Sequence, residues 1–234
     1  QEQQVLLRLT VFRSGFTQAA GAAVAGASLH TLATLAEKAL VQITQDRLAR
    51  NRYQMHELLR QFAAERLASS NGAAAKTQAR HSDYYLAFLQ QHAPLLLGKE
   101  QQQAVQAIGD ELDNLRAALM WAIQNGNSVM LVHALDPLYT FYQIQSRYLE
   151  GTELFVAALA RWSSSAPALD EKGPQVQIQL VARCGALSYL LGEYSAAGRY
   201  LQTALALAEA CAAQRELAFI LNFLGRWAMW QGEK

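Results

Sequence analysis

The chain has 234 residues, of which 52% are hydrophobic and 17% are charged, and its formal net charge is +1. This composition is typical of a soluble globular protein, and the length allows one large domain or two small ones. Residues 1–70 carry eight basic against five acidic side chains, an excess too small to require a nucleic-acid partner. No apolar run approaches the roughly 20 residues of a membrane span, and the first residues do not resemble a signal peptide. We therefore expect a cytoplasmic protein with buried thiols and no membrane partner.

Residues 1–68 predict three helices, a β-hairpin and a fourth helix, which is the element order of a winged-helix domain. Hydrophobic spacing near 3.6 residues indicates the helices, and short alternation of apolar and polar residues indicates the strands. Thr17 and Ser28 stand where an N-cap is expected. The predicted elements are helices over 2–12, 17–26, 29–40 and 57–70, and strands over 41–44 and 52–55.

The remainder of the chain predicts helix almost throughout. Residues 69–126 are interpreted as a linker, SSNGAAAKTQ, followed by a first helical pair. Residues 127–234 contain an internal repeat, in which 146–159 and 192–205 align and 232–234 begins a further copy. We expect a mainly α fold: a winged helix with a small β-hairpin, followed by a right-handed α-solenoid of helical hairpins like tetratricopeptide repeats. The last copy stops at its turn, so we expect a fragment.

The order of these segments resembles a known family. The stretches that carry the resemblance are LTVFRSGFTQAAGAAVAG, LATLAEKALVQIT, RYQMHELLRQFAAERL, RHSDYYLAF and ELDNLRAALMWAI. Together they resemble the bacterial STAND-type signalling ATPases, which contain an NB-ARC module followed by a winged helix and tetratricopeptide repeats. The resemblance implies that the chain is a regulatory and sensor part of such a protein, with ADP or ATP and Mg²⁺ bound by the chain's own upstream nucleotide-binding domain.

The resemblance also assigns a role to His56. In this family a Met-His-Asp motif stands at the junction of strand and helix, and its histidine contacts the β-phosphate of ADP. The present sequence reads Met55-His56-Glu57, so His56 is carried over as the ADP phosphate sensor. The longer Glu57 leaves the role of the carboxylate open. A histidine at a helix start can bind an anionic phosphate on general grounds, and the alternative is that His56 only packs or caps between hairpin and helix.

The sequence predicts no catalysis by this chain. No GxxxxGK[ST] phosphate loop occurs, so we expect neither ATPase activity nor a cofactor in this segment. The five histidines show no paired metal-ligand spacing, and no metal site is predicted. The acidic residues Asp110, Glu111 and Asp113 are interpreted as a solvated helix face.

Two alternatives to the switch are a plain repeat scaffold for protein interaction and a DNA-binding winged helix. The predicted hairpin tip offers Arg47, Arg50 and Arg52 as candidate nucleic-acid contacts. The helix over 29–40 has few side chains suited to base reading, so direct DNA binding is not favoured. On the repeats, Tyr139, Tyr142, Arg147 and Tyr148 are the predicted patch for an unknown inducer or protein ligand, because aromatics beside an arginine suit peptide or anion capture.

Overall fold

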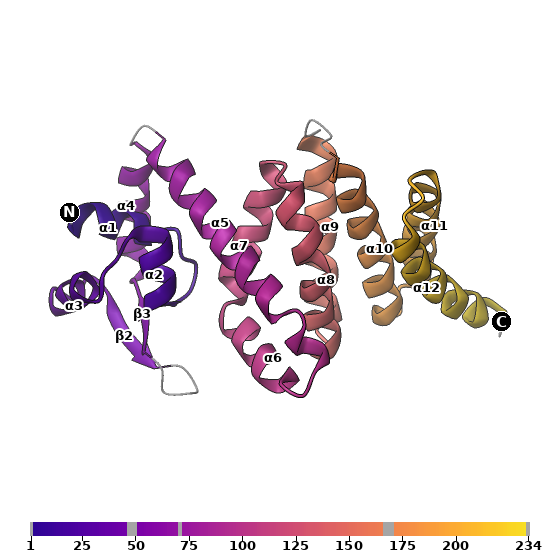
Figure 1. The fold of residues 1–234 in the computed structure, drawn as a ribbon, viewed down its shortest axis with the longest axis horizontal. Helices are drawn as coiled ribbons and strands as arrows, with labels where there is room; N and C mark the ends of the chain where they lie inside the picture. The colour runs from indigo at the N-terminus through magenta and orange to yellow at the C-terminus, as the bar shows by residue number, and fades with distance from the viewer. Residues whose placement is uncertain (1, 46–50, 70–71, 166–170, 233–234) are drawn as a thin grey trace. The chain divides into compact units, whose positions relative to one another are not determined.

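A computed structural model describes residues 2–45, 51–69, 72–165 and 171–232. These residues are mainly helical, with twelve α-helices, one 3₁₀ turn and a small antiparallel sheet of three strands. Figure 1 labels these elements along the chain, which divides into two compact units by its internal contacts. The first unit comprises residues 1–91 and 106–121, and the second comprises 92–105 and 122–234.

The first unit combines the sheet with seven helices or parts of helices. Its strands follow the order β1-β3-β2, and both neighbouring pairs are antiparallel. Tyr53 in the central strand lies opposite Phe16 on one side and Ile43 on the other. The elements are α1 (Glu2–Leu9), β1 (Phe16–Thr17), α2 (Gln18–Ala25), α3 (Leu29–Glu37), β2 (Gln42–Gln45), β3 (Asn51–Gln54), α4 (Glu57–Ala68), α5 (Ala73–His92), α6 (Gln101–Asp110) and α7 (Leu112–Gln124).

Local capping signals fix the starts of α2 and α3. The Thr17 hydroxyl accepts a hydrogen bond from the amide of Ala20 at 3.1 Å, and the Ser28 hydroxyl accepts one from the amide of Thr31 at 3.0 Å. Both side chains satisfy a helix amide that lacks a partner within its helix, which is the physical role of an N-cap. The two predicted N-caps are therefore confirmed.

An aromatic stack forms the core of the first unit. Phe12 stacks on Phe16 with ring centroids 4.4 Å apart, and Phe16 stacks in turn on Tyr53 at 5.9 Å. Tyr85 of α5 meets Phe12 edge-on, so α5 is part of the same core. Strand β1, which places Phe16 in this stack, was not predicted. The predicted linker was largely wrong, because α5 begins at Ala73 and makes residues 73–78 helical.

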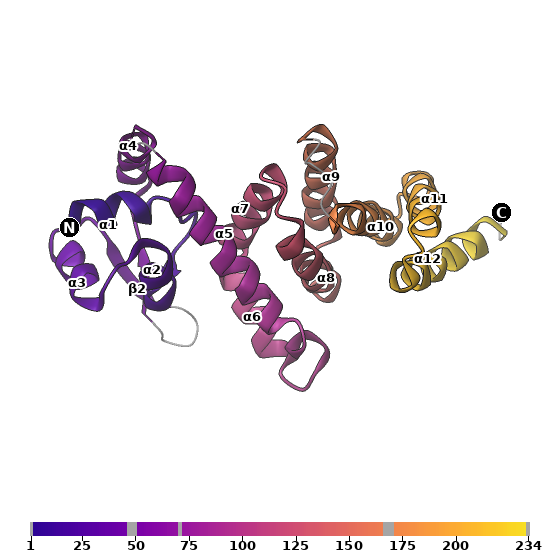
Figure 2. The same ribbon diagram turned by 45° about the horizontal axis from the view of Figure 1, so that its top comes forward.

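The second unit is built from helices that pack on their neighbours in sequence: α8 on α9, α9 on α10, α10 on α11 and α11 on α12 (Figure 2). Small residues allow close approach at these contacts. A Cβ atom on Gly185 would lie 2.8 Å from Leu201, and one on Gly198 would lie 2.5 Å from the Trp227 ring. The elements are the 3₁₀ turn η1 (Leu95–Leu97), α8 (Ser128–Ile144), α9 (Tyr148–Ser165), α10 (Gly173–Leu191), α11 (Tyr194–Ala210) and α12 (Gln214–Gly232).

The boundaries between the two compact units follow residues 91, 105 and 121. These boundaries lie within α5, α6 and α7, and the segments 1–68, 69–126 and 127–234 remain a prediction from sequence. A search of the described residues for membrane spans finds no single helix that is long and apolar enough. One bent pair, α2 with α3, meets the criterion by length and composition when the two helices are taken together.

Candidate functional site

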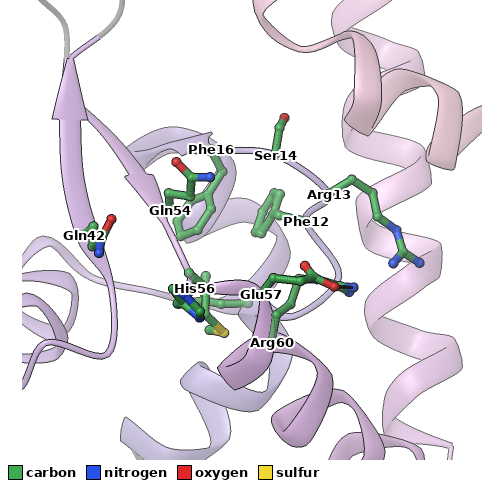
Figure 3. Close-up of a pocket in the computed structure, with 11 residues that line it drawn as sticks. Phe12, Arg13, Ser14, Phe16, Gln42, Gln54, His56, Glu57 and Arg60 are labelled. Carbon is green, nitrogen blue, oxygen red and sulfur yellow. Dashed lines mark hydrogen bonds and ion pairs between the residues drawn. The ribbon is translucent and has the colours of Figure 1, made fainter.

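A pocket of about 260 Å³ opens at the start of α4, inside the first unit. Its walls come from the loop after α1, the two hairpin strands and the first turn of α4. In Figure 3, His56, Glu57 and Arg60 lie on one side, with Ser14 and Gln54 on the other. The lining residues are Leu9, Phe12, Arg13, Ser14, Phe16, Gln42, Gln54, Met55, His56, Glu57 and Arg60.

His56 is the N-cap of α4 and is exposed to solvent. Its Nδ1 accepts a hydrogen bond from the amide of Leu58 at 3.3 Å. Because Nδ1 accepts, the neutral imidazole carries its proton on Nε2, on the other side of the ring. His56 therefore caps α4, which was the alternative interpretation of this residue. Its second nitrogen, Nε2, can still donate a hydrogen bond to a ligand.

Glu57 is held by its own helix. Both of its oxygens accept hydrogen bonds from the Arg60 guanidinium at 2.7 Å, and Oε1 also accepts from Gln61 at 2.8 Å. These bonds from Arg60 and then Gln61 lower the pKa of the carboxyl to about 2. Glu57 is therefore ionised at neutral pH and compensates one of the two arginines at the pocket.

The second arginine gives the pocket an excess of positive charge. Within the described part of the chain, the Arg13 guanidinium forms no ion pair. Burial lowers the pKa of Arg13, and the nearby charge of Arg60 lowers it further. With Arg13 and Arg60 against Glu57, the pocket offers a net charge of +1, the Nε2–H of His56 and the start of an α-helix. Each of these features favours an anion.

Behind the pocket lies a buried polar network that joins β3 to α5 and α7. The Arg52 guanidinium donates to Glu111 Oε1 at 2.5 Å and to the carbonyl of Gly15 at 2.8 Å. Tyr85 donates its hydroxyl hydrogen to Glu111 Oε2 at 2.9 Å, and Asn114 donates to the same oxygen at 3.0 Å. Each charged or polar group in this network has a partner, which is what burial requires.

This network corrects two predictions. Arg52 is 9% exposed and points into the ion pair, so it is not a nucleic-acid contact at the hairpin tip. Glu111 is 5% exposed, so the acidic cluster is not simply a solvated helix face. The other two candidate contacts, Arg47 and Arg50, lie outside the described residues.

The predicted ligand patch on the repeats does not form as one exposed surface. Tyr142 is fully buried against Gly151, and Tyr139 is 5% exposed, with burial raising its pKa to about 12. Arg147 pairs with Glu150 in the next helix, with its Nε 2.8 Å from Oε1. Tyr148 is half-buried. These side chains are close in the sequence, but Tyr139 and Tyr142 lie on the face of α8 that is buried against other helices.

A second buried polar cluster connects three helices of the second unit. Arg183 of α10 forms ion pairs with Asp136 of α8 and with Glu216 of α12, the latter at 2.7 Å. Its guanidinium also lies 3.7 Å from the centroid of the Phe219 ring. Arg183 and Glu216 are 3% and 2% exposed.

Among the described residues, no group of three or more His, Cys, Asp or Glu side chains could hold a metal ion.

Sequence reasoning singled out His56 but not most of the residues that surround it in the pocket. Arg13 and Arg60 were not singled out, although the three-residue spacing of Glu57 and Arg60 on a helix is a recognisable ion-pair signal. No local signal pointed to the contact of Asn114 with the pocket, because its partners Arg13 and Gly15 lie about a hundred residues earlier in the chain.

Comparison with known proteins gives relatives for part of the chain. Three mycobacterial proteins, one from Mycobacterium bovis and two from strains of Mycobacterium tuberculosis, are each 36% identical to it over 148 residues. All three are provisionally named as HTH-type transcriptional regulators. The match covers 59% of this chain and 16% of each relative, so the chain spans only a small part of their length. No protein-family model matches the chain, and no solved structure is significantly similar to it.

Proposed function

We propose that the chain is the regulatory and sensor part of a transcriptional regulator built as a STAND-type signalling ATPase. In this proposal the nucleotide-binding module, with its ADP or ATP and Mg²⁺, belongs to another part of the intact, cytoplasmic regulator. The pocket around His56 docks on that module and contacts the phosphates of ADP. The names of the mycobacterial relatives support a regulatory role, and their much greater length leaves room for such a module.

The observation that carries the proposal is the arrangement at the start of α4. An exposed imidazole has Nδ1 engaged by the Leu58 amide, which leaves Nε2–H for a ligand. The uncompensated charge of Arg13 lies in the same pocket. At about 260 Å³ the pocket is smaller than the roughly 300–1,000 Å³ typical of whole-ligand sites. That size supports a role in which this chain supplies one wall around a phosphate group and another module holds the rest of the nucleotide.

We also propose the finer fold assignments. Three helices, a hairpin and a further helix, with the short β1 on the other side of β3, support a winged helix over residues 1–68. Helices α8 to α12 pack on their sequence neighbours around small residues such as Gly185 and Gly198, which supports a right-handed solenoid of tetratricopeptide-like hairpins over 127–234. An inducer or protein partner on the repeats would shift the intact regulator from an ADP-bound to an ATP-bound state by binding the second state more tightly.

The test is nucleotide retention by the intact regulator. Loss of a hydrogen bond to a charged phosphate costs about 1.5–3 kcal/mol, so His56→Ala should weaken ADP binding by about 10- to 100-fold. ADP that remains bound after purification is measured by chromatography of the denatured protein. His133→Ala, which removes an exposed histidine of α8, is the matched control and should retain wild-type levels. Equal ADP content in the wild type and His56→Ala would refute the sensor role, and no nucleotide in any of the three proteins would favour a plain interaction scaffold.

Direct DNA binding is the second candidate function, because the relatives are named as HTH-type regulators. The described surface of α3 supports it weakly. Lys38, just after α3, is held by Glu2 in an ion pair at 2.5 Å, and Arg52 is buried. A gel shift of the 234-residue chain on duplex DNA at 50 and 200 mM salt decides between the two. Binding that falls steeply with salt would support DNA contact by this chain.

A further inference from the structure

One short segment, residues 12–16, forms a large part of the pocket wall opposite α4, and we name it the pocket loop. Phe12, Arg13, Ser14 and Phe16 all line the pocket. The loop connects α1 to β1 and has no regular secondary structure between Phe12 and Gly15. Its conformation therefore depends on contacts from outside the loop.

One side chain of α7 supplies several of these contacts. Asn114 accepts a hydrogen bond from the Arg13 amide at 2.9 Å through Oδ1. Through Nδ2 it donates to the Gly15 carbonyl at 3.1 Å and to the Ser14 hydroxyl at 3.4 Å. Asn114 is fully buried. A single amide thus bonds to three successive residues of the pocket loop.

Glu111 fixes which way this amide faces. Its Oε2 accepts a hydrogen bond from Asn114 Nδ2 at 3.0 Å, and an ionised carboxylate can only accept. Nδ2 must therefore lie on the Glu111 side, which turns Oδ1 toward the Arg13 amide. Arg52 and Tyr85 hold the carboxylate in turn, at 2.5 and 2.9 Å. The orientation of the amide is thereby determined by a network that is itself buried.

We propose that Asn114, oriented by Glu111, is a positioning residue that sets the conformation of the pocket loop and thereby the affinity of the pocket for phosphate anions. This inference rests on the proposed function, since it requires an anion to bind beside His56. Asn114 does not touch the anion and acts through the backbone of residues 13–15. By linkage, anion binding in the pocket and the seating of α7 on the loop stabilise each other to the same degree.

The experiment titrates the 234-residue chain with inorganic pyrophosphate and follows the NMR signals of the His56 ring and the Arg13 amide. Asn114→Ala removes all the contacts of the amide with the loop and should lower pyrophosphate affinity by about tenfold, which corresponds to about 1.4 kcal/mol. Ser82→Ala is the matched control. It removes the buried hydrogen bond that the Ser82 hydroxyl of α5 donates to the Ala118 carbonyl of α7 at 2.9 Å. This bond does not involve the pocket loop. The affinity of this variant should stay within about twofold of wild type.

The outcomes separate the two proposals. Wild-type affinity in Asn114→Ala, with wild type still binding at His56, would overturn the positioning role and leave the phosphate site standing. The same loss of affinity in Ser82→Ala would also overturn it, because general loosening of the helix pair would then explain the effect. No response of His56 to pyrophosphate in the wild type would overturn the positioning role, because the loop would then position no anion, while ADP retention by the intact regulator tests the proposed function separately. If Asn114→Ala does not fold, Asn114→Asp, which keeps the acceptor but not the donor to Gly15, is assessed in the same way.

Discussion

Acidification should destabilise the first unit through His81. This α5 residue is 2% exposed, and its ring packs against Phe12 and Tyr85 with centroids 5.5 and 4.7 Å away. Burial lowers the pKa of His81 from 6.5 to about 4, although its hydrogen bond with Asn114 acts in the opposite direction. The native protein therefore keeps His81 neutral at a pH where the unfolded chain already binds a proton.

The sign and size of the effect follow from linkage. Between pH 6.5 and pH 4 the unfolded state holds more protons, so the free energy of unfolding decreases as the pH falls through this window. A difference of about 2.5 pKa units corresponds to about 3 kcal/mol in full. About 2 kcal/mol of it should be lost between pH 7 and pH 5, because the unfolded histidine is mostly protonated at pH 5.

The assay compares urea unfolding of the wild type and His81→Gln at pH 7 and pH 5, followed through the amide NMR signals of α5. Glutamine does not titrate and keeps an N–H for Asn114, so other titrating groups cancel in the comparison. We expect the wild type to lose about 2 kcal/mol more than the variant on going to pH 5. An equal loss in both proteins would refute the reasoning, because it would show that His81 is already protonated in the native state or is accessible to water.

Two further predictions concern the second unit. Gly198→Ala should lower the free energy of unfolding by about 1–3 kcal/mol, since its Cβ would lie 2.5 Å from the Trp227 ring. Gly225→Ala should instead raise the free energy of unfolding by up to about 1 kcal/mol, because nothing lies within 4 Å of the added Cβ. Both variants are measured by urea unfolding, and similar changes in the two would contradict the close contact of Gly198 with Trp227. In the native protein a thiol reagent should label exposed Cys211 and spare buried Cys184, whose pKa burial raises to about 12. The labelling is followed by absorbance, and rapid reaction of both thiols in the native protein would contradict the burial of Cys184.

The element order was predictable because its signals are local. The N-caps at Thr17 and Ser28, the hairpin strands and the helix after His56 each follow from side chains within a few residues. The two hairpin strands were placed within one residue of their observed bounds. Strand β1 was missed because two residues carry no periodicity, and it exists only through pairing with β3, where Phe16 lies opposite Tyr53 and Thr17 opposite Arg52.

The surroundings of the candidate site were beyond local reasoning. Asp110, Glu111 and Asp113 share one turn, and nothing in that turn shows that Glu111 alone meets Arg52, a residue 59 positions earlier. The prediction that Tyr139 and Tyr142 form an exposed ligand patch was wrong for a related reason. Helical spacing places them on one face of α8, but spacing does not tell whether that face meets solvent or another helix.

The shared guanidinium of Arg183 makes α8, α10 and α12 dependent on one another. Removing either acidic partner would leave the buried Arg183 with one carboxylate in place of two and would break its link to α8 or to α12. Ordinary repeat arrays can gain or lose hairpins because each unit mainly needs its nearest neighbours. Here α8 and α12 are linked through Arg183, so α8, α10 and α12 should unfold cooperatively. A helical hairpin could be exchanged only if Asp136, Arg183 and Glu216 were all kept together.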